Sequence, residues 1–315
     1  MTILTVTLNP AIDVTYRIPA LEAGTTVPVT EVRTRAGGKG VNVASVVRGL
    51  GGDSLVLAFA GFAQPDGFRA GLDALGLRHR LVPACESVRR TVAVVADDGT
   101  TTNLNEPGAE VTTGAEAAIT AVLRTELAAG AGAAVISGSV PPGLAAEVPA
   151  RLVAVCAGYG VPVIADVSGA ALRAVATAGA VLMPNRHELA QLLGPLPRSA
   201  ADVTAAGRRL VRDGAAAVVA TAGEDGVIAV TPGGAWSARP VEAVAGNPTG
   251  AGDAAAAALA RHLAAAGSVS GVDWPAALAD VVATSAASVR EPVAGEIDAE
   301  ARSGWLGAVT VRETA

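Results

Sequence analysis

Short runs of apolar, β-branched residues recur along the chain, and each is bounded by turn-forming residues. Between many of them lie longer alanine-rich segments with helical periodicity, at residues 114–129, 146–157 and 200–213. The predicted strands are residues 3–8, 54–60, 91–96, 133–137, 161–165, 216–221 and 226–230. Strands that alternate with helices indicate an α/β fold, in which a mostly parallel sheet is covered on both faces.

Two stretches, residues 11–35 and 88–107, break this alternation. Both are rich in Thr, Val and Arg, show no helical pattern, and carry turns such as DDGT. We expect them to form a small antiparallel sheet attached to the main body, in the position of a lid. No low-complexity linker or internal repeat separates them from the rest, so the pattern predicts one domain over residues 1–315.

Composition narrows the classes of partner. Of the 315 residues, 51% are hydrophobic and only 3% aromatic, and the formal net charge is -6. This charge argues against a nucleic-acid surface or an anionic membrane as partner, but it leaves an anionic small substrate open. The two cysteines, Cys85 and Cys156, lie far apart, and no signal peptide or membrane span is recognisable, so we expect a cytoplasmic protein with reduced thiols.

One lysine stands out among the basic residues. Lys39 is the single lysine among 23 basic residues, and all others are arginines. Its presence indicates a place that needs a compact ammonium rather than a planar guanidinium, unless it is there by chance.

The segment NPTGAGDAAAAALA (247–260) sets Asp253 directly before a long apolar run. It formally satisfies the dinucleotide pattern G-x-G-x-x-G/A, but only about 60 residues follow it, too few for that fold. Two interpretations remain open. Asp253 is either a helix N-cap or a catalytic base, in which case Gly250, Ala251 and Gly252 would leave backbone N–H groups free for an anion.

A second glycine cluster, RAGGKGVNVASVV (35–47), contains Gly38, Lys39 and Asn42. It is not a Walker A loop, because Gly rather than Ser or Thr follows the lysine. Its backbone can approach a ligand closely, with Lys39 and Asn42 supplying a charge and an amide. The alternative is an ordinary glycine-rich start of a helix.

Two further segments carry polar residues at turns. Asp13 follows the first strand, where sugar hydroxyls would collect at the edge of an open α/β sheet, although a turn built on Asn9 also explains the segment. Asn185 and Glu188 are three apart at a helix start, which fits either a capping box or a hydrated Mg²⁺. The three histidines have no metal-ligand spacing.

Taken in order, these segments resemble those of a known family. They are N-P-x-x-D near the start, G-G-K-G-V-N-V-A, L-N-E-P-G at 104–108, S-G-S-V-P-P-G at 137–143, P-N-x-x-E and N-P-T-G-A-G-D. The chain is similar over nearly its full length to the PfkB (ribokinase-like) carbohydrate kinases, in the branch of 1-phosphofructokinases and tagatose-6-phosphate kinases. The resemblance implies a three-layer αβα sandwich with a small β-sheet lid that serves as a homodimer contact.

The resemblance also implies transfer of the ATP γ-phosphoryl group to a hydroxyl of a ketohexose monophosphate, with Mg²⁺ as the metal. Asp253 would be the base, and the N–H groups of Gly250, Ala251 and Gly252 the anion hole. The residues expected to bind the phosphosugar are Asp13, Gly38, Lys39, Asn42, Arg90 and Ser139. Those expected to serve Mg²⁺-ATP are Asn185, Thr221, Gly223 and Gly226, with Glu188 and Asn185 reaching the metal through water.

The chain departs from the branch at three positions. Val92 and Val94 stand where polar residues usually follow the arginine, and Met183 stands where a lysine commonly precedes P-N. If both valines face the substrate, contacts to the sugar or its phosphate are missing. The departures keep open a kinase of a non-phosphorylated sugar or nucleoside. A non-catalytic sugar-phosphate-binding protein and a dehydrogenase are the alternatives from other classes.

Overall fold

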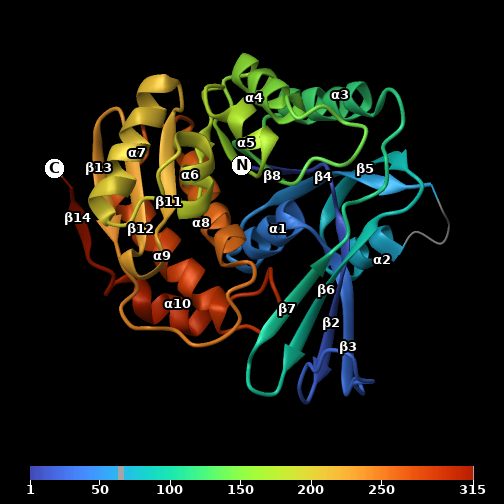
Figure 1. Cartoon of the computed structure of the whole chain (residues 1–315). Helices are drawn as coiled ribbons and strands as arrows, with labels where there is room; N and C mark the ends of the chain where they lie inside the picture. Colours follow the sequence, from blue (N-terminus) through green and yellow to red (C-terminus); the bar gives the residue numbers. More distant parts are fainter. Residues whose placement is uncertain (63–66, 315) are drawn as a thin grey trace.

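The computed structural model describes residues 1–62 and 67–314, which form a ten-stranded sheet flanked by helices and a separate four-stranded sheet (Figure 1). The large sheet has the strand order β14-β13-β12-β11-β10-β9-β8-β1-β4-β5. Its strands are β1 (Ile3–Thr7), β4 (Ser54–Gly61), β5 (Arg78–Cys85), β8 (Ala133–Gly138), β9 (Val163–Val167), β10 (Val181–Leu182), β11 (Ala217–Thr221), β12 (Val227–Thr231), β13 (Gly234–Ala238) and β14 (Val311–Glu313).

All strand pairs from β5 to β11 are parallel, as the alternation of strands and helices predicts. The strand predicted at 226–230 is present as β12, but it pairs antiparallel with β11 and begins an antiparallel edge that continues through β13 and β14. Only the short 3₁₀ turn η1 (Gly223–Asp225) separates β11 from β12. Such a connection is too short for the crossover that a parallel pair requires.

Helices cover both faces of the large sheet, so the three-layer αβα sandwich is confirmed. On one face lie α1 (Lys39–Gly49), α8 (Ala251–Ala266) and α9 (Trp274–Val289), with α10 (Ala299–Leu306) packed on α9. On the other face lie α3 (Ala115–Ala128), α4 (Val148–Gly158), α5 (Ala170–Val175), α6 (Arg186–Leu193) and α7 (Ala200–Asp213). Within the described residues, no helix is both long and apolar enough to cross a bilayer.

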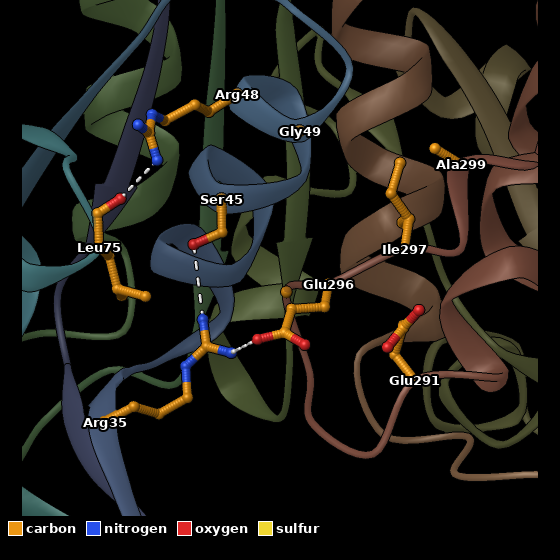
Figure 2. Close-up of a pocket in the computed structure, with 10 residues that line it drawn as sticks. Arg35, Ser45, Arg48, Gly49, Leu75, Glu291, Glu296, Ile297 and Ala299 are labelled. Atoms are coloured by element: carbon orange, nitrogen blue, oxygen red, sulfur yellow. Dashed lines mark hydrogen bonds and ion pairs between the residues drawn. The ribbon is translucent and has the colours of Figure 1, made fainter.

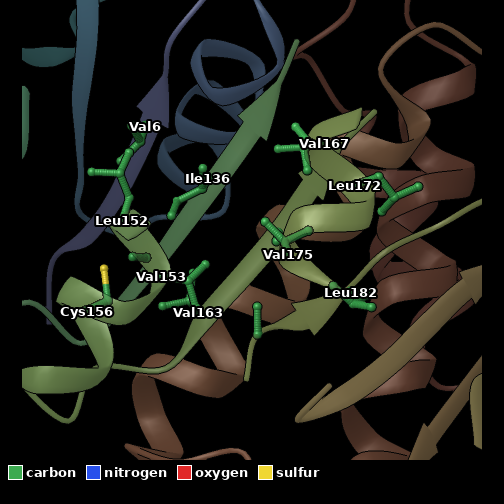
Figure 3. Close-up of a cluster of buried hydrophobic side chains, with 14 of the residues drawn as sticks. Val6, Ile136, Leu152, Val153, Cys156, Val163, Val167, Leu172, Val175 and Leu182 are labelled. Carbon is green, nitrogen blue, oxygen red and sulfur yellow. The ribbon is translucent and has the colours of Figure 1, made fainter. Parts of the chain in front are cut away.

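Each face of the large sheet has its own core because alternate residues of a strand point to opposite sides. Leu4 and Val6 of β1 join the core beneath α3–α7, whereas Ile3 joins the core beneath α1, α8 and α9. Figure 3 shows part of the first core, where Leu152 and Leu172 pack onto the central strands. A third, smaller cluster lies under α2 (Gly67–Ala74).

The four-stranded sheet has the order β3-β2-β6-β7, built from β2 (Ala11–Ile18), β3 (Glu31–Gly37), β6 (Arg89–Ala96) and β7 (Thr101–Asn105). It occupies the two stretches that break the alternation. The expectation of a fully antiparallel sheet is wrong in one pair, since β2 and β6 run parallel. The chain passes through β4 and β5 of the large sheet between them, and this long connection permits the parallel pairing.

The two faces of the small sheet differ in polarity. The registers place Asp13, Arg35 and Thr91 side by side on one face, together with Thr15 and Arg33. The opposite face carries a row of apolar side chains, namely Ile12, Val14, Tyr16, Val32, Val92, Val94 and Leu104. Val92 and Val94 therefore face away from Asp13, and they do not remove contacts on the side of that carboxylate.

Candidate active site

Two adjoining clefts lie at the carboxyl ends of the parallel strands, and the first of them also borders the polar face of the small sheet. We call the first the inner cleft, a cavity of about 310 Å³. Among its lining residues are ten that the sequence predicted: Asp13, Gly38, Lys39, Asn42, Asn185, Glu188, Thr221, Gly250, Gly252 and Asp253. The second, the outer cleft, is a cavity of about 840 Å³ that includes Gly223, Gly226 and Ala251. The two clefts share Asn185, Thr221 and Gly252.

Asp253 lies in the first turn of α8, and the residue is only 5% exposed. Its carboxylate accepts a hydrogen bond of 2.8 Å from the Asn42 side-chain amide. Burial raises the pKa of Asp253 to about 7, although Lys39 acts in the opposite direction. Gly250 is the N-cap and no side chain caps the helix, so Asp253 is not a helix cap. A buried carboxylate with this pKa is suited to accept a proton near neutral pH.

The start of α8 is an open helix N-terminus. Gly250 adopts the left-handed conformation with φ 88°, and a Cβ there would come within 2.6 Å of the Ala294 Cβ. A Cβ at Gly252 would meet no atom within 4 Å, so this residue borders open space between the clefts. The Ala251 N–H, which was expected in the anion hole, donates to the Pro248 carbonyl oxygen. The remaining N–H groups of the first turn and the positive end of the helix dipole together favour an anion here.

Lys39 is the first residue of α1, directly after Gly38 at φ 107°. Its ammonium group lies 2.9 Å from the Asp166 carboxylate. Burial alone would lower the pKa of Lys39, but the carboxylates of Asp166, Asp253 and Glu188 raise it above its ordinary value. The ammonium thus stays protonated and close to three carboxylates. A long, flexible stem with a compact charge fits this crowded position better than a guanidinium.

Asp166 was missed by the sequence analysis. It lies on β9, and its side chain is only 8% exposed. The rule that places Asp13 at the site applies to it equally, because an acid near the carboxyl end of a buried parallel strand faces the ligand edge. The apolar run 161–165 predicts a strand, and the acid that directly follows it is the signal for this residue.

Asp13 lies on β2 and accepts a hydrogen bond from the Thr91 hydroxyl. Burial raises the pKa of Asp13, while Thr91, Arg35 and Arg89 oppose the shift. Gly37 on β3 lies two residues from Arg35, the register partner of Asp13, and a Cβ at Gly37 would lie 1.9 Å from an Asp13 carboxylate oxygen. Only glycine leaves room for this carboxylate.

Arg90, which the resemblance assigns to the substrate, is not among the residues that line the inner cleft. Arg90 faces the same side of β6 as Val92 and is exposed, whereas Arg89 and Thr91 line the inner cleft. The Arg89 guanidinium is held by hydrogen bonds to the backbone carbonyls of Asn9 and Glu106. Successive residues of a strand point to opposite faces of the sheet, so these neighbouring arginines lie on different faces. The sequence alone does not show which of the two faces borders the cleft.

Ser139 accepts a hydrogen bond of 2.9 Å from the Asn9 side-chain amide and is not among the residues that line the inner cleft. Gly226, at φ 80°, makes the turn between β11 and β12, where a Cβ would come within 2.1 Å of the Ala238 carbonyl oxygen.

Met183, which stands where the family commonly has a lysine, lines the inner cleft and gives that part of the wall an apolar side chain.

Asn185 and Glu188 form a capping box at the start of α6. The Asn185 side-chain oxygen accepts from the N–H groups of His187 and Glu188, and the Glu188 carboxylate accepts from the Asn185 N–H. Burial raises the pKa of Glu188, against the effects of the Asn185 N–H and Lys39. Among the described residues, no group of three or more His, Cys, Asp or Glu side chains is placed to hold a metal. The role in Mg²⁺ binding stays a prediction.

Comparison with known proteins supports a single family. Residues 5–301 match the pfkB family carbohydrate kinase. The 1-phosphofructokinase of Xanthomonas campestris pv. campestris is 36% identical over 267 residues, which cover 82% of this chain and 83% of that protein. Two structures of phosphofructokinase-2 from Escherichia coli, one with fructose-6-phosphate and one of the tetrameric inhibited form, are each 25% identical. Both alignments cover 97% of this chain and 98% of the other, with TM-scores of 0.85 and 0.86.

Proposed function

The chain belongs to the pfkB family of carbohydrate kinases, and on that premise we propose that it transfers the γ-phosphoryl group of ATP to a hydroxyl of a ketohexose monophosphate. Fructose 1-phosphate is the first candidate, followed by tagatose 6-phosphate and fructose 6-phosphate. The 36% identity to a 1-phosphofructokinase supports this order. The observation that carries the reaction type is Asp253, a buried carboxylate with a pKa of about 7, beside an open helix N-terminus where two clefts meet.

The outer cleft is proposed to take ATP. It is larger than the inner cleft, and its wall includes apolar side chains of Val227, Val241 and Val244 against which a base can lie. Its polar end is at Asn185, Thr221 and Gly252, the residues it shares with the inner cleft. A nucleotide bound in this orientation directs its terminal phosphate to the start of α8, where the helix N-terminus favours negative charge.

The inner cleft is proposed to take the phosphosugar. Asp253 accepts the proton of the attacking hydroxyl, whose oxygen forms a bond to the γ-phosphorus. The bond from that phosphorus to the bridging oxygen breaks, and its electron pair leaves with ADP. Asn42 holds the Asp253 carboxylate in place through its 2.8 Å hydrogen bond. The Lys39 ammonium and the N–H groups at the start of α8 stabilise the negative charge on the transferred group.

The residues present fit a magnesium ion bound chiefly by phosphates and water. Asp166 and Glu188 both line the inner cleft, and the charge of Asp166 adds to the raised pKa of Glu188. One or two carboxylates are usual for Mg²⁺ in kinases. The Asn185 side-chain oxygen already accepts two N–H groups, so it would contribute only through water. When bound, the ion neutralises charge on the ATP phosphates.

Arg89 replaces Arg90 as the proposed ligand of the phosphate that the substrate already carries, with Asp13 on the sugar hydroxyls. A forked guanidinium is suited to a phosphate. Arg89→Met should raise KM for the phosphosugar about tenfold, since a hydrogen bond to a charged group contributes roughly 1.5–3 kcal/mol. The matched control is Arg90→Met, which should stay within about twofold of wild type. Equal effects of the two variants would contradict the assignment.

We also propose that the small sheet is a lid and that a second copy of the chain covers its apolar face. Val32 and Leu104, on the two edge strands of this face, are 57% and 58% exposed, which is unusual for large apolar side chains at both ends of one apolar face. Leu104→Glu should shift the protein towards monomers in sedimentation velocity experiments. A wild-type monomer at all concentrations would contradict the proposal.

The decisive experiment is an ADP-release panel with fructose 1-phosphate, tagatose 6-phosphate, fructose 6-phosphate and the corresponding free hexoses. We expect the highest kcat/KM with a ketohexose monophosphate and strict dependence on ATP and Mg²⁺. Faster turnover of a free hexose would overturn the substrate class. The absence of ADP release with every acceptor would overturn the function.

A further inference from the structure

Arg35 connects two parts of the chain that both contribute to the site. It lies on β3, opposite Asp13 in the register of the β2–β3 pair, and its side chain is only 15% exposed. Figure 2 shows its guanidinium extending from the small sheet towards Ser45 of α1 and Glu296. Glu296 belongs to the segment between α9 and α10, residues 290–298, which we call the α9–α10 loop.

The guanidinium of Arg35 has several partners at once. It donates a hydrogen bond to the Ala294 carbonyl oxygen, and its other terminal nitrogen lies 3.5 Å from the Ser45 hydroxyl. The Glu296 carboxylate lies 3.9 Å away, at the edge of ion-pair distance. A planar group with several donors can hold two acceptors on different elements in a fixed geometry, which an ammonium cannot do.

The α9–α10 loop in turn packs against the catalytic groups. Ala294 lies against Gly250, and Gly295 is packed so tightly that a Cβ would be 3.2 Å from the Asn42 side-chain oxygen and 2.9 Å from the Arg35 guanidinium. Pro292 accepts a hydrogen bond from the side chain of Asn247, in the turn that leads into α8. The loop therefore backs the open helix start and the amide that holds Asp253.

We propose that Arg35 is a positioning residue for phosphoryl transfer. Its guanidinium fastens the α9–α10 loop, and through it Gly250 and Asn42, to the strand pair that carries Asp13. The distance between the strands that carry Asp13 and the start of α8 is thereby kept constant. Displacement of reacting groups by about 1 Å can cost 100-fold in rate, so a link three contacts away from the base is sufficient to matter.

The proposal rests on the proposed kinase activity, and its test compares variants only with wild-type enzyme on the acceptor that wild type uses best. Arg35→Met keeps most of the stem and removes the donors. We expect kcat to fall about tenfold and KM for the phosphosugar to rise about fivefold, with KM for ATP within twofold. The matched control is Arg33→Met, on the same face of β3, whose side chain donates a hydrogen bond to Glu31 of its own strand. This control should leave all three constants within about twofold.

The split between constants separates positioning from simple loss of packing. A purely structural role would lower the fraction of active sites, so kcat would fall while both KM values stayed unchanged, and that result would overturn the proposal. Wild-type constants in Arg35→Met would overturn it as well. If Arg35→Met does not fold, Arg35→Lys retains the charge and one donor, and should fold with an intermediate kcat and a raised phosphosugar KM. Wild-type constants in Arg35→Lys would overturn the need for a guanidinium. If the wild-type protein showed no kinase activity with any acceptor, that result would refute the proposed function rather than the role of Arg35.

Discussion

Two helices begin at the wall shared by the clefts, and they begin differently. The start of α6 is closed by its own side chains, since Asn185 and Glu188 form a complete capping box. The start of α8 has Gly250 as N-cap and no side-chain cap. Both Asn185 and Gly252 border the two clefts. The same location thus holds one helix N-terminus that is satisfied internally and one that is left for a ligand.

The difference shows how local chemistry assigns roles to two similar sites. A side-chain cap stabilises a helix and removes donors that an anion could use, whereas an uncapped glycine start gives up that stabilisation and keeps the donors. The function we propose places the transferred phosphoryl group at α8 and gives α6 only a supporting part. Changes at each helix start therefore have different expected effects.

The largest effect is expected from a change of Asp253, the proposed catalytic base in the first turn of α8. Asp253→Asn removes the proton acceptor but keeps the shape and the hydrogen-bonding capacity of the side chain. We expect kcat to fall by about 10³-fold, within the range that general-base catalysis supplies. Binding of a non-hydrolysable ATP analogue, measured by calorimetry, should change less than about threefold, because only a group acting in the transition state is lost. Near-normal turnover would exclude Asp253 as the base.

The next effect separates folding from catalysis at the same helix start. Gly252→Ala adds a methyl group where no atom lies within 4 Å, in a helical residue, so the protein should be stabilised by roughly 0.5–1 kcal/mol. The methyl group enters the space shared by the clefts, and kcat should fall about tenfold or more. Gly250→Ala is the contrasting variant, since its positive φ and contact with Ala294 should destabilise the fold by more than about 1 kcal/mol. An unchanged kcat in Gly252→Ala would mean that the phosphoryl group passes elsewhere.

The third prediction concerns pH and follows from the raised pKa of Asp253, about 7, against an ordinary value of 3.8. Between these values the folded state binds the proton more tightly than the unfolded state. The contribution of Asp253 to folding stability therefore decreases as pH rises from about 4 to 7. Asp253→Asn should raise the urea midpoint relative to wild type at pH 8, and this gain should shrink at pH 5. A gain that does not depend on pH would contradict the raised pKa.

The smallest effect is expected at α6. Asn185→Ala should cost about 1 kcal/mol of stability through loss of the cap. Ser199→Ala provides a matched control, because Ser199 and Asp202 form a complete capping box on α7. If Asn185 also serves the nucleotide, only Asn185→Ala should raise KM for Mg²⁺-ATP, by a few-fold. Equal kinetics for the two variants would leave Asn185 as a cap alone.

Much of the fold was predictable because buried parallel strands read as continuous apolar runs. All five residues of β1 and of β9 are buried, which fits such a run. The direction in which strands pair was harder to predict from the sequence. β12 runs antiparallel to β11, and β2 runs parallel to β6, and neither direction was expected. These directions depend on the length and path of the connections rather than on the strand's own residues. β5 was missed since charged residues interrupt it at Arg78 and Arg80.

In the site, the residues carried by glycine-rich segments were predictable, since Lys39, Asn42 and Asp253 all line the inner cleft. Residues whose role depends on which face of a strand they occupy, or on a partner far away in the sequence, were not predictable. Arg89 differs from Arg90 only in the side of β6 that it faces. Arg35 acts on a loop about 260 positions further along the chain, a contact that only the tertiary fold brings about.

The single lysine makes the inner cleft chemically distinct from the rest of the molecule. Apart from the α-amino group at Met1, the chain holds its one primary amine at Lys39, which is 41% exposed and bound to Asp166. An amine-selective reagent would therefore label the inner cleft with no competing side chain, and the protonated ion pair would slow that labelling. A ligand bound in the inner cleft would protect Lys39 from the reagent. The fraction of protein that carries the label on Lys39, measured by mass spectrometry, would then report how much of the cleft is occupied.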